Sequence, residues 1–150
     1  MLRVLSPVAG HSLTVNDIPD PVFARGLVGP GVAIAPRPGP QVAVAPVDGT
    51  LVKLLAHAYL VLADDGTGIL VHLGIDTVTM QGDGFALLAT ENDRVHAGDP
   101  VVRWDPSYVE RAGLSAVCAV VALDREPAAV TACALEVEVE PGQELFRVRP

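Results

Sequence analysis

Two histidines embedded in apolar segments are the residues of this sequence best suited to carry chemistry. His57 lies within the apolar run 54–62, and His72 lies within the run 69–75, fifteen positions further along. Both runs have the composition of strands, and the segment 64–68 between them has the composition of a turn. We therefore expect an antiparallel hairpin that brings the two imidazoles together. Near neutral pH an imidazole can be an uncharged nucleophile, a proton carrier or a metal ligand.

The residues that follow His72 indicate how a reaction partner could reach it. If residues 70–76 form one strand, its side chains alternate between faces, so His72, Gly74 and Asp76 share a face. Gly74 has no side chain and would leave an open space beside the imidazole. Asp76 would then lie at the rim, where it could pair with an incoming cation. The other residues would face the core and fix the ring, as a transfer reaction requires.

Three functions fit a histidine pair of this kind. In phosphoryl transfer, one neutral imidazole nitrogen attacks a phosphoryl group while the second histidine donates a hydrogen bond to its oxygens. In a zinc site, His72 and Asp76 would be ligands and His57 a third. The third function is structural, because an isolated histidine in a strand is more often a hydrogen-bonded core residue. The residues alone leave these three alternatives open.

Composition and charge exclude several classes of protein. The 150 residues are enough for one domain with a core, so we expect a single domain over residues 1–150. The net charge of −8 argues against a nucleic-acid partner and is compatible with a basic protein partner. No signal pattern or membrane-spanning apolar stretch is present, which predicts a soluble, cytoplasmic protein without membrane insertion. Cys118 and Cys133 lie in apolar surroundings, and we expect both to be buried, reduced thiols.

Glycine and proline punctuate the chain and favour short strands over long helices. There are 14 Gly and 13 Pro, separated by short runs of Val, Ile, Leu and Ala. This pattern predicts an all-β fold, an antiparallel β-sandwich or flattened barrel with few short helices. Residues 134–140 alternate apolar and acidic side chains, which predicts a strand with one apolar face. Helices are expected only near 84–90 and at 106–112, the second capped by Asp105.

A weak internal duplication is visible. Residues 6–10 (SPVAG) resemble 45–49 (APVDG), and residues 95–101 (VHAGDPV) resemble 139–145 (VEPGQEL). Each copy is a glycine-containing bend that leads into a strand. Two copies are too few for a solenoid, so the pattern predicts two interlocked halves of one β domain, an internal pseudo-repeat.

The segments around both histidines resemble the glucose-type IIA domain of the bacterial phosphoenolpyruvate-dependent sugar phosphotransferase system. The most specific match is VHLGIDT at residues 71–77, followed by GDGF at 82–85. The other matches, in the family's order, are PDPVFA at 19–24, VGPGVAI at 28–34, VAPVDGT at 44–50 and HAY at 57–59. The resemblance extends over roughly residues 4–149. It implies a β-sandwich of the duplicated hybrid type.

The resemblance also implies a phosphotransferase function for the histidine pair. His72 would accept a phosphoryl group from the histidine of the carrier protein HPr, and His57 would stabilise that group. The group would then pass to a cysteine of the IIB domain of a sugar permease, and onward to sugar that enters through the IIC membrane channel. No cofactor is required for this transfer, and we expect a monomer.

A docking surface for these partners follows from the same resemblance. Asp20 and Asp76 match acidic residues that flank the family's active face, and Gly74 lies beside them. Val22, Leu27 and Leu70 match its apolar docking patch. One departure concerns Leu55, because family members often carry a threonine there that orients the first histidine. Larger aromatic residues of the patch are also replaced by leucine, at Leu55 and Leu70.

Other functions remain as alternatives. A non-enzymatic regulatory protein could dock through the same face, and a zinc ion could then lie between a partner's carboxylate and both His57 and His72. A zinc peptidase of related fold needs a later His-x-His, which the sequence lacks. A biotinyl or lipoyl carrier needs a modified lysine at a hairpin tip, and the only lysine, Lys53, lies in no such motif. The sequence does not identify the sugar or the IIB and IIC partners.

Overall fold

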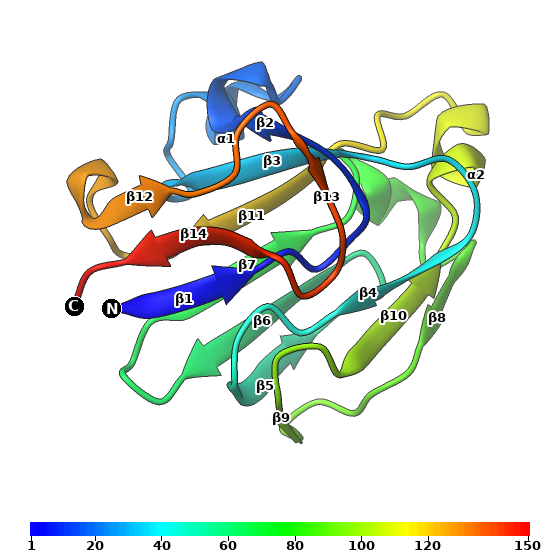
Figure 1. The fold of residues 1–150 in the computed structure, drawn as a ribbon. Helices are drawn as coiled ribbons and strands as arrows, with labels where there is room; N and C mark the ends of the chain where they lie inside the picture. Colours follow the sequence, from blue (N-terminus) through cyan, green and yellow to red (C-terminus); the bar gives the residue numbers. More distant parts are fainter.

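Short antiparallel strands are the main regular structure of the fold. The computed structural model describes residues 1–150 (Figure 1). The strands are β1 (Leu2–Leu5), β2 (Gly10–Thr14), β3 (Gly31–Pro36), β4 (Gln41–Val44), β5 (Gly49–Leu54), β6 (Ala58–Ala63), β7 (Gly68–His72), β8 (Phe85–Leu87), β9 (Arg94–Val95), β10 (Pro100–Trp104), β11 (Cys118–Ala122), β12 (Val130–Ala132), β13 (Glu138–Val139) and β14 (Glu144–Val148). The helices are α1 (Pro21–Ala24) and α2 (Pro106–Arg111), with 3-10 helices at Val15–Asp17, Thr77–Met80 and Pro127–Ala129.

The strands form three antiparallel sheets. An eight-stranded sheet has the order β13-β2-β3-β11-β7-β6-β5-β9, and two three-stranded sheets have the orders β1-β14-β12 and β4-β10-β8. A single apolar cluster of 28 buried residues draws on all three sheets, with Val71 from the large sheet, Phe146 from one small sheet and Trp104 from the other. Burial of this cluster supplies the main driving force for folding. The predicted antiparallel β-sandwich with few short helices is confirmed.

The internal duplication appears as a two-fold relation between the halves of the fold. The large sheet reads β13-β2-β3-β11 from one edge and β9-β5-β6-β7 from the other, and the small sheets read β1-β14-β12 and β4-β10-β8. Gly10 on β2 pairs with Val139 on β13, and Gly49 on β5 pairs with Val95 on β9. The repeated sequence segments therefore occupy equivalent places in the two halves, as predicted.

The two halves exchange hydrogen bonds at their repeated bends. Leu5 N donates to Pro46 O of the other half, and Val44 N donates to Pro7 O in the reciprocal contact, each at 2.9 Å. Each bend therefore has a carbonyl that accepts a hydrogen bond from the other half. The halves are interlocked rather than placed side by side.

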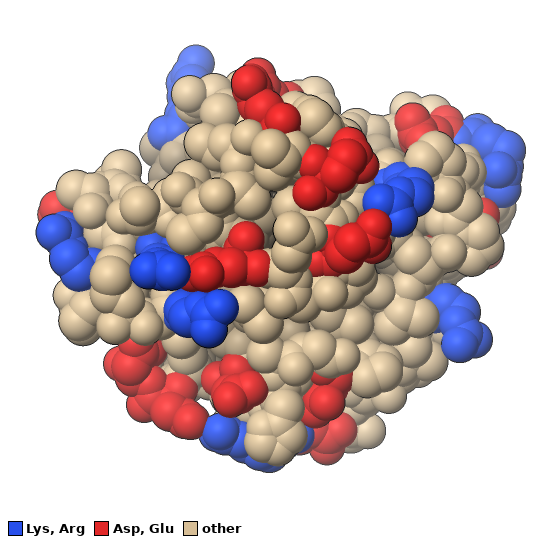
Figure 2. Space-filling model, viewed as in Figure 1, with Lys and Arg blue, Asp and Glu red and all other residues tan.

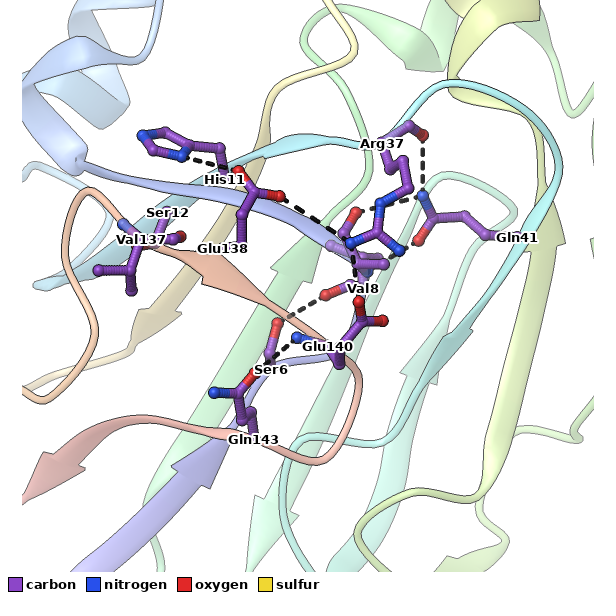
Figure 3. Close-up of polar contacts among 11 residues, drawn as sticks. Ser6, Val8, His11, Ser12, Arg37, Gln41, Val137, Glu138, Glu140 and Gln143 are labelled. Carbon is purple, nitrogen blue, oxygen red and sulfur yellow. Dashed lines mark hydrogen bonds and ion pairs between the residues drawn. The ribbon is translucent and has the colours of Figure 1, made fainter.

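A charged cluster fixes the edge strand β13 against β2 (Figure 3). His11 Nδ1 lies 3.0 Å from Glu138 Oε1. Arg37 donates to Glu140 Oε1 at 2.7 Å and lies 3.9 Å from Glu138 Oε2. The side chains of this cluster are largely exposed, so each contact contributes little to stability.

The predicted helix at 106–112 is confirmed, but the one near 84–90 is wrong. Asp105 caps α2 by accepting a hydrogen bond from Ser107 N at 2.9 Å. Residues 85–87 instead form β8, which pairs with β10. Gly82 and Gly84 both adopt positive φ, at 83° and 86°, so the chain turns there and enters a strand. An added Cβ at Gly84 would lie 2.4 Å from the Tyr108 ring, so this turn packs against α2.

The predicted strand over residues 134–140 is wrong except at Glu138–Val139. Glu136 adopts a left-handed φ of 56°, which interrupts an extended strand. Leu135 and Val137 are exposed rather than facing the core. The expectation of two buried thiols is half right, because Cys118 is buried and Cys133 is exposed. Burial raises the pKa of the Cys118 thiol to about 12.

Two further features of the fold concern the length of its helices and the distribution of acidic side chains on its surface. No helix in the structure combines the length and apolar character needed to cross a lipid bilayer. Acidic side chains gather along the lower edge of Figure 2. The β6–β7 turn carries two of the chain's acidic residues, Asp64 and Asp65. Arg94 Nη1 lies 2.6 Å from Asp64 Oδ1, so the negative charge of this turn is partly compensated.

Candidate functional site

The two histidines meet at one end of the β6–β7 hairpin. Strands β6 and β7 are antiparallel, with Ala58 opposite His72, and Leu73 N donates to His57 O at 2.7 Å. The imidazole centroids lie 5.1 Å apart, with an angle of 72° between the ring planes. The hairpin prediction is confirmed, although His57 lies in the turn before β6 and not in a strand.

Small side chains lie opposite His72 on both neighbouring strands of the large sheet. Val71 and Leu73 are fully buried in the core, so the His72 side chain points to the opposite face. Its cross-strand neighbours are Ala58 on β6 and Ala119 on β11. Methyl side chains on both sides leave room above the sheet for other rings to contact the imidazole.

The strand ends at His72 and does not continue to Asp76. Gly74 and Asp76 adopt positive φ values of 78° and 60°, which turn the chain into the 3-10 helix Thr77–Met80. Gly74 is buried, and an added Cβ would lie 2.5 Å from Thr77 Cγ2 and 3.0 Å from Ser115 O. The prediction that Gly74 leaves an open space beside the imidazole is therefore wrong. The chain needs glycine here for its backbone conformation and for close packing.

Gly74 acts on His72 through its backbone carbonyl. His72 Nδ1 lies 2.5 Å from Gly74 O. A carbonyl oxygen only accepts hydrogen bonds, so Nδ1 carries the proton and Nε2 retains a lone pair. Ile75 N donates to Ser115 O at 2.9 Å, and Thr77 Oγ1 donates to Leu73 O at 2.7 Å, which holds the loop in this conformation. His72 is thus presented as a nucleophile with one free nitrogen.

Burial lowers the pKa of both imidazoles below their ordinary value of 6.5. For His72, burial outweighs the opposing effects of the hydrogen bond to Gly74 and the charges of Asp20 and Asp76. For His57, burial acts together with the charge of His72. Both rings are therefore uncharged at neutral pH, and an uncharged imidazole is the nucleophilic form.

Helix α1 brings Asp20 and an aromatic ring to the site. Asp20 caps the helix, because its Oδ1 accepts from Val22 N at 2.8 Å and from Phe23 N at 3.4 Å. Pro21 occupies the first helical position, which favours the helix start. The Phe23 ring lies against His72, with centroids 5.3 Å apart and planes at 62°. Phe23 was not predicted as a site residue, because no local sequence pattern places α1 beside β7.

Exposed apolar side chains lie on the elements around the pair. The largest exposures are 49% for Val22, 70% for Leu27, 44% for Leu55 and 60% for Val78. Leu70 is half-buried and lies two residues before His72 on the same face of β7. Of the predicted docking residues, Val22 lies on α1, Leu27 lies in the turn after α1, and Leu70 lies on β7. Exposed apolar side chains of this kind are typical of a protein-binding surface.

The His57 ring makes no hydrogen bond to a protein group, in contrast to His72. Leu55, two residues earlier, is exposed and offers no polar atom to orient it. The chain contains no group of three or more His, Cys, Asp or Glu side chains arranged to hold a metal ion. Two imidazoles alone would leave two of the four coordination positions of a zinc ion to other ligands.

Comparison with known proteins identifies the family. Residues 2–127 match the family model described as phosphoenolpyruvate-dependent sugar phosphotransferase system, EIIA 1. The match covers well over half of the chain, so the protein belongs to this family. The family resemblance of the sequence is thereby confirmed.

Individual relatives agree with this assignment. The chain is 36% identical over 123 residues to the glucose-specific EIIBCA component of Corynebacterium glutamicum, a match that covers 81% of this chain and 18% of that protein. It is 34% identical over 121 residues to the glucose-specific EIIA component of Buchnera aphidicola, covering 79% of this chain and 74% of that protein. The solved structure of glucose permease IIA from Mycoplasma capricolum matches with a TM-score of 0.83 and 30% identity, covering 97% of this chain and 94% of the other.

Proposed function

We propose that this protein is a phosphoryl carrier of the sugar phosphotransferase system. It accepts a phosphoryl group from phospho-HPr on His72 and passes it to the IIB domain of a sugar permease, in the cytoplasm. The observation that carries the proposal is the fixed tautomer of His72, whose Nδ1 donates to Gly74 O and whose Nε2 is free beside a second imidazole. Family membership and the names of the relatives support the same function.

The chemical step follows from this tautomer. The lone pair of His72 Nε2 attacks phosphorus, the new N–P bond forms, and the N–P bond to the donor imidazole breaks as the donor recovers its lone pair. Positive charge develops on the His72 ring, and the Nδ1–H bond to Gly74 O stabilises it. In the onward step a thiolate of the acceptor attacks phosphorus, and the electrons of the Nε2–P bond return to His72.

His57 has a different role because its ring nitrogens are free of protein partners. The ring lies 5.1 Å from that of His72, close enough to donate a hydrogen bond to a phosphoryl oxygen attached to Nε2. This donor stabilises the negative charge on the transferring group, a main requirement of phosphoryl transfer. Asp20 and Asp76 place negative charge near the same site, which favours a partner with a basic docking face.

The test measures phosphoryl gain by mass after incubation with phospho-HPr. The wild-type protein and the His96→Gln variant, which changes an exposed histidine of another loop, are expected to gain one acid-labile phosphoryl group. The His72→Gln variant should gain none, and His57→Gln should accept the group but transfer it poorly to a IIB domain. Phosphorylation of His72→Gln would refute the assignment of the acceptor. A wild-type protein that gains no mass would favour a regulatory docking function instead.

A further inference from the structure

The His72 imidazole is held by three contacts, and only two of them belong to its own hairpin. Gly74 O binds its Nδ1, and the His57 ring lies against it. The third contact comes from the Phe23 ring on α1, nearly fifty residues earlier in the chain, in an edge-to-face arrangement at 5.3 Å. Aromatic rings at this separation and angle attract one another beyond simple burial. The Phe23 contact therefore restricts how the His72 ring can rotate.

Phe23 is itself anchored and does not depend on the docking of a partner. Its side chain packs against a separate apolar cluster formed by Ile18, Ala33, Ile75 and Ala119. Helix α1 is fixed at its start by the Asp20 cap, and its end is closed by Leu27 N donating to Val22 O at 3.0 Å. Phe23 differs in this from its neighbour Val22, whose side chain is about half exposed. The helix thus presents an exposed residue to solvent and a half-buried ring to the imidazole.

We propose that Phe23 is a positioning residue for His72, and that its ring also shields the phosphohistidine from water. The inference rests on the proposed function. Hydrolysis of phosphohistidine requires water oxygen to attack phosphorus while the Nε2–P bond breaks. The electron pair of that bond returns to Nε2, and the water oxygen leaves with its protons as part of inorganic phosphate. A ring packed against one side of the imidazole excludes water from that side of the phosphorylated residue. The carrier then retains its phosphoryl group until an acceptor thiolate arrives.

The phosphohistidine lifetime is the direct test of shielding. Each protein is phosphorylated with phosphoramidate, a small donor that needs no docking surface, and the release of inorganic phosphate is followed without partners. Phe23→Leu is expected to hydrolyse about two- to tenfold faster than wild type, the range that corresponds to loss of an aromatic pair. Phe23→Tyr, which keeps the ring, should restore the lifetime. Phe85→Leu is the matched control, because Phe85 stacks on Trp104 and not on a histidine.

Nitrogen-15 spectra of the unphosphorylated protein test positioning separately. Wild type and Phe85→Leu should show His72 as one tautomer, with the proton on Nδ1. Phe23→Leu should show averaging between tautomers and a pKa for His72 closer to 6.5, because the ring is less buried. Unchanged spectra together with a wild-type lifetime in Phe23→Leu would overturn the inference. Failure of the wild-type protein to accept phosphate from phospho-HPr would refute the proposed function, while the spectra would still decide whether Phe23 positions His72.

Discussion

Replacing Gly74 by alanine tests how the loop after β7 holds the His72 imidazole. Gly74 has a φ of 78°, and a left-handed conformation costs an L-residue about 1–2 kcal/mol. The new Cβ would also lie 2.5 Å from Thr77 Cγ2 and 3.0 Å from Ser115 O, and overpacking of this kind costs about 1–3 kcal/mol. We therefore expect Gly74→Ala to lower the free energy of unfolding by about 2–5 kcal/mol.

Gly66 provides a matched control for the backbone contribution. It has a φ of 89° in the β6–β7 turn, and an added Cβ there would meet nothing within 4 Å. Gly66→Ala should therefore lose only about 1–2 kcal/mol. Both variants gain equally from a less flexible unfolded chain, so this effect cancels in the comparison. Urea unfolding can be followed by the fluorescence of the single, buried Trp104. Equal losses in the two variants would refute the assignment of close packing at Gly74.

Two further predictions concern the titration of the site and its exposed rim. Because burial lowers the pKa of His57 and His72, the unfolded chain binds more protons than the folded one between the lowered values and 6.5. Urea titrations at about pH 7.5 and about pH 5.5 should therefore show that acidification lowers the unfolding free energy of the wild-type protein. The loss should be smaller for the doubly substituted His57→Gln, His72→Gln protein. Equal losses in the two proteins would contradict the conclusion that both imidazoles are uncharged in the folded state. Leu27→Ser should change the unfolding free energy by less than about 0.5 kcal/mol, since the side chain is exposed, but should raise KM for phospho-HPr in steady-state assays. Leu87→Ser, at an exposed position on β8, is the control and should leave this KM unchanged. An unchanged KM for Leu27→Ser would show that Leu27 is not part of the docking surface.

The fold was predictable where the sequence has regular local patterns. Short aliphatic runs bounded by glycine and proline correctly indicated strands such as Pro100–Trp104. The Asp105-Pro106 pair correctly indicated the start of α2, because the cap and the proline act within the first turn. The alternation at 134–140 wrongly indicated a continuous strand, because Glu136 is held in a left-handed conformation that the side-chain pattern does not encode. Strand order and the interlocking of the halves depend on contacts distant in sequence.

The histidine pair was predictable from the hairpin, but its immediate surroundings were not. Spacing and turn composition placed His57 and His72 on neighbouring segments, and the structure brings their rings together. Gly74 was predicted to leave open space but instead permits close packing. A glycine can do either, and the sequence does not give the backbone conformation and neighbours that distinguish the two. Phe23 was missed because its contact with His72 depends on where α1 folds back over the sheet.

The two-fold relation between the halves has a consequence for where this site could form at all. His72 belongs to β7, the innermost strand of one half, and its neighbour Ala119 belongs to β11, the innermost strand of the other. A solitary half would end at β7 and leave that strand with an unpaired border exposed to water. In the complete fold β7 pairs with β6 on one side and with β11 of the other half on the other side. This pairing holds the backbone of His72 rigidly in the sheet. The position of the His72 ring thus depends on the junction of the two halves, and neither half alone would pair both edges of β7.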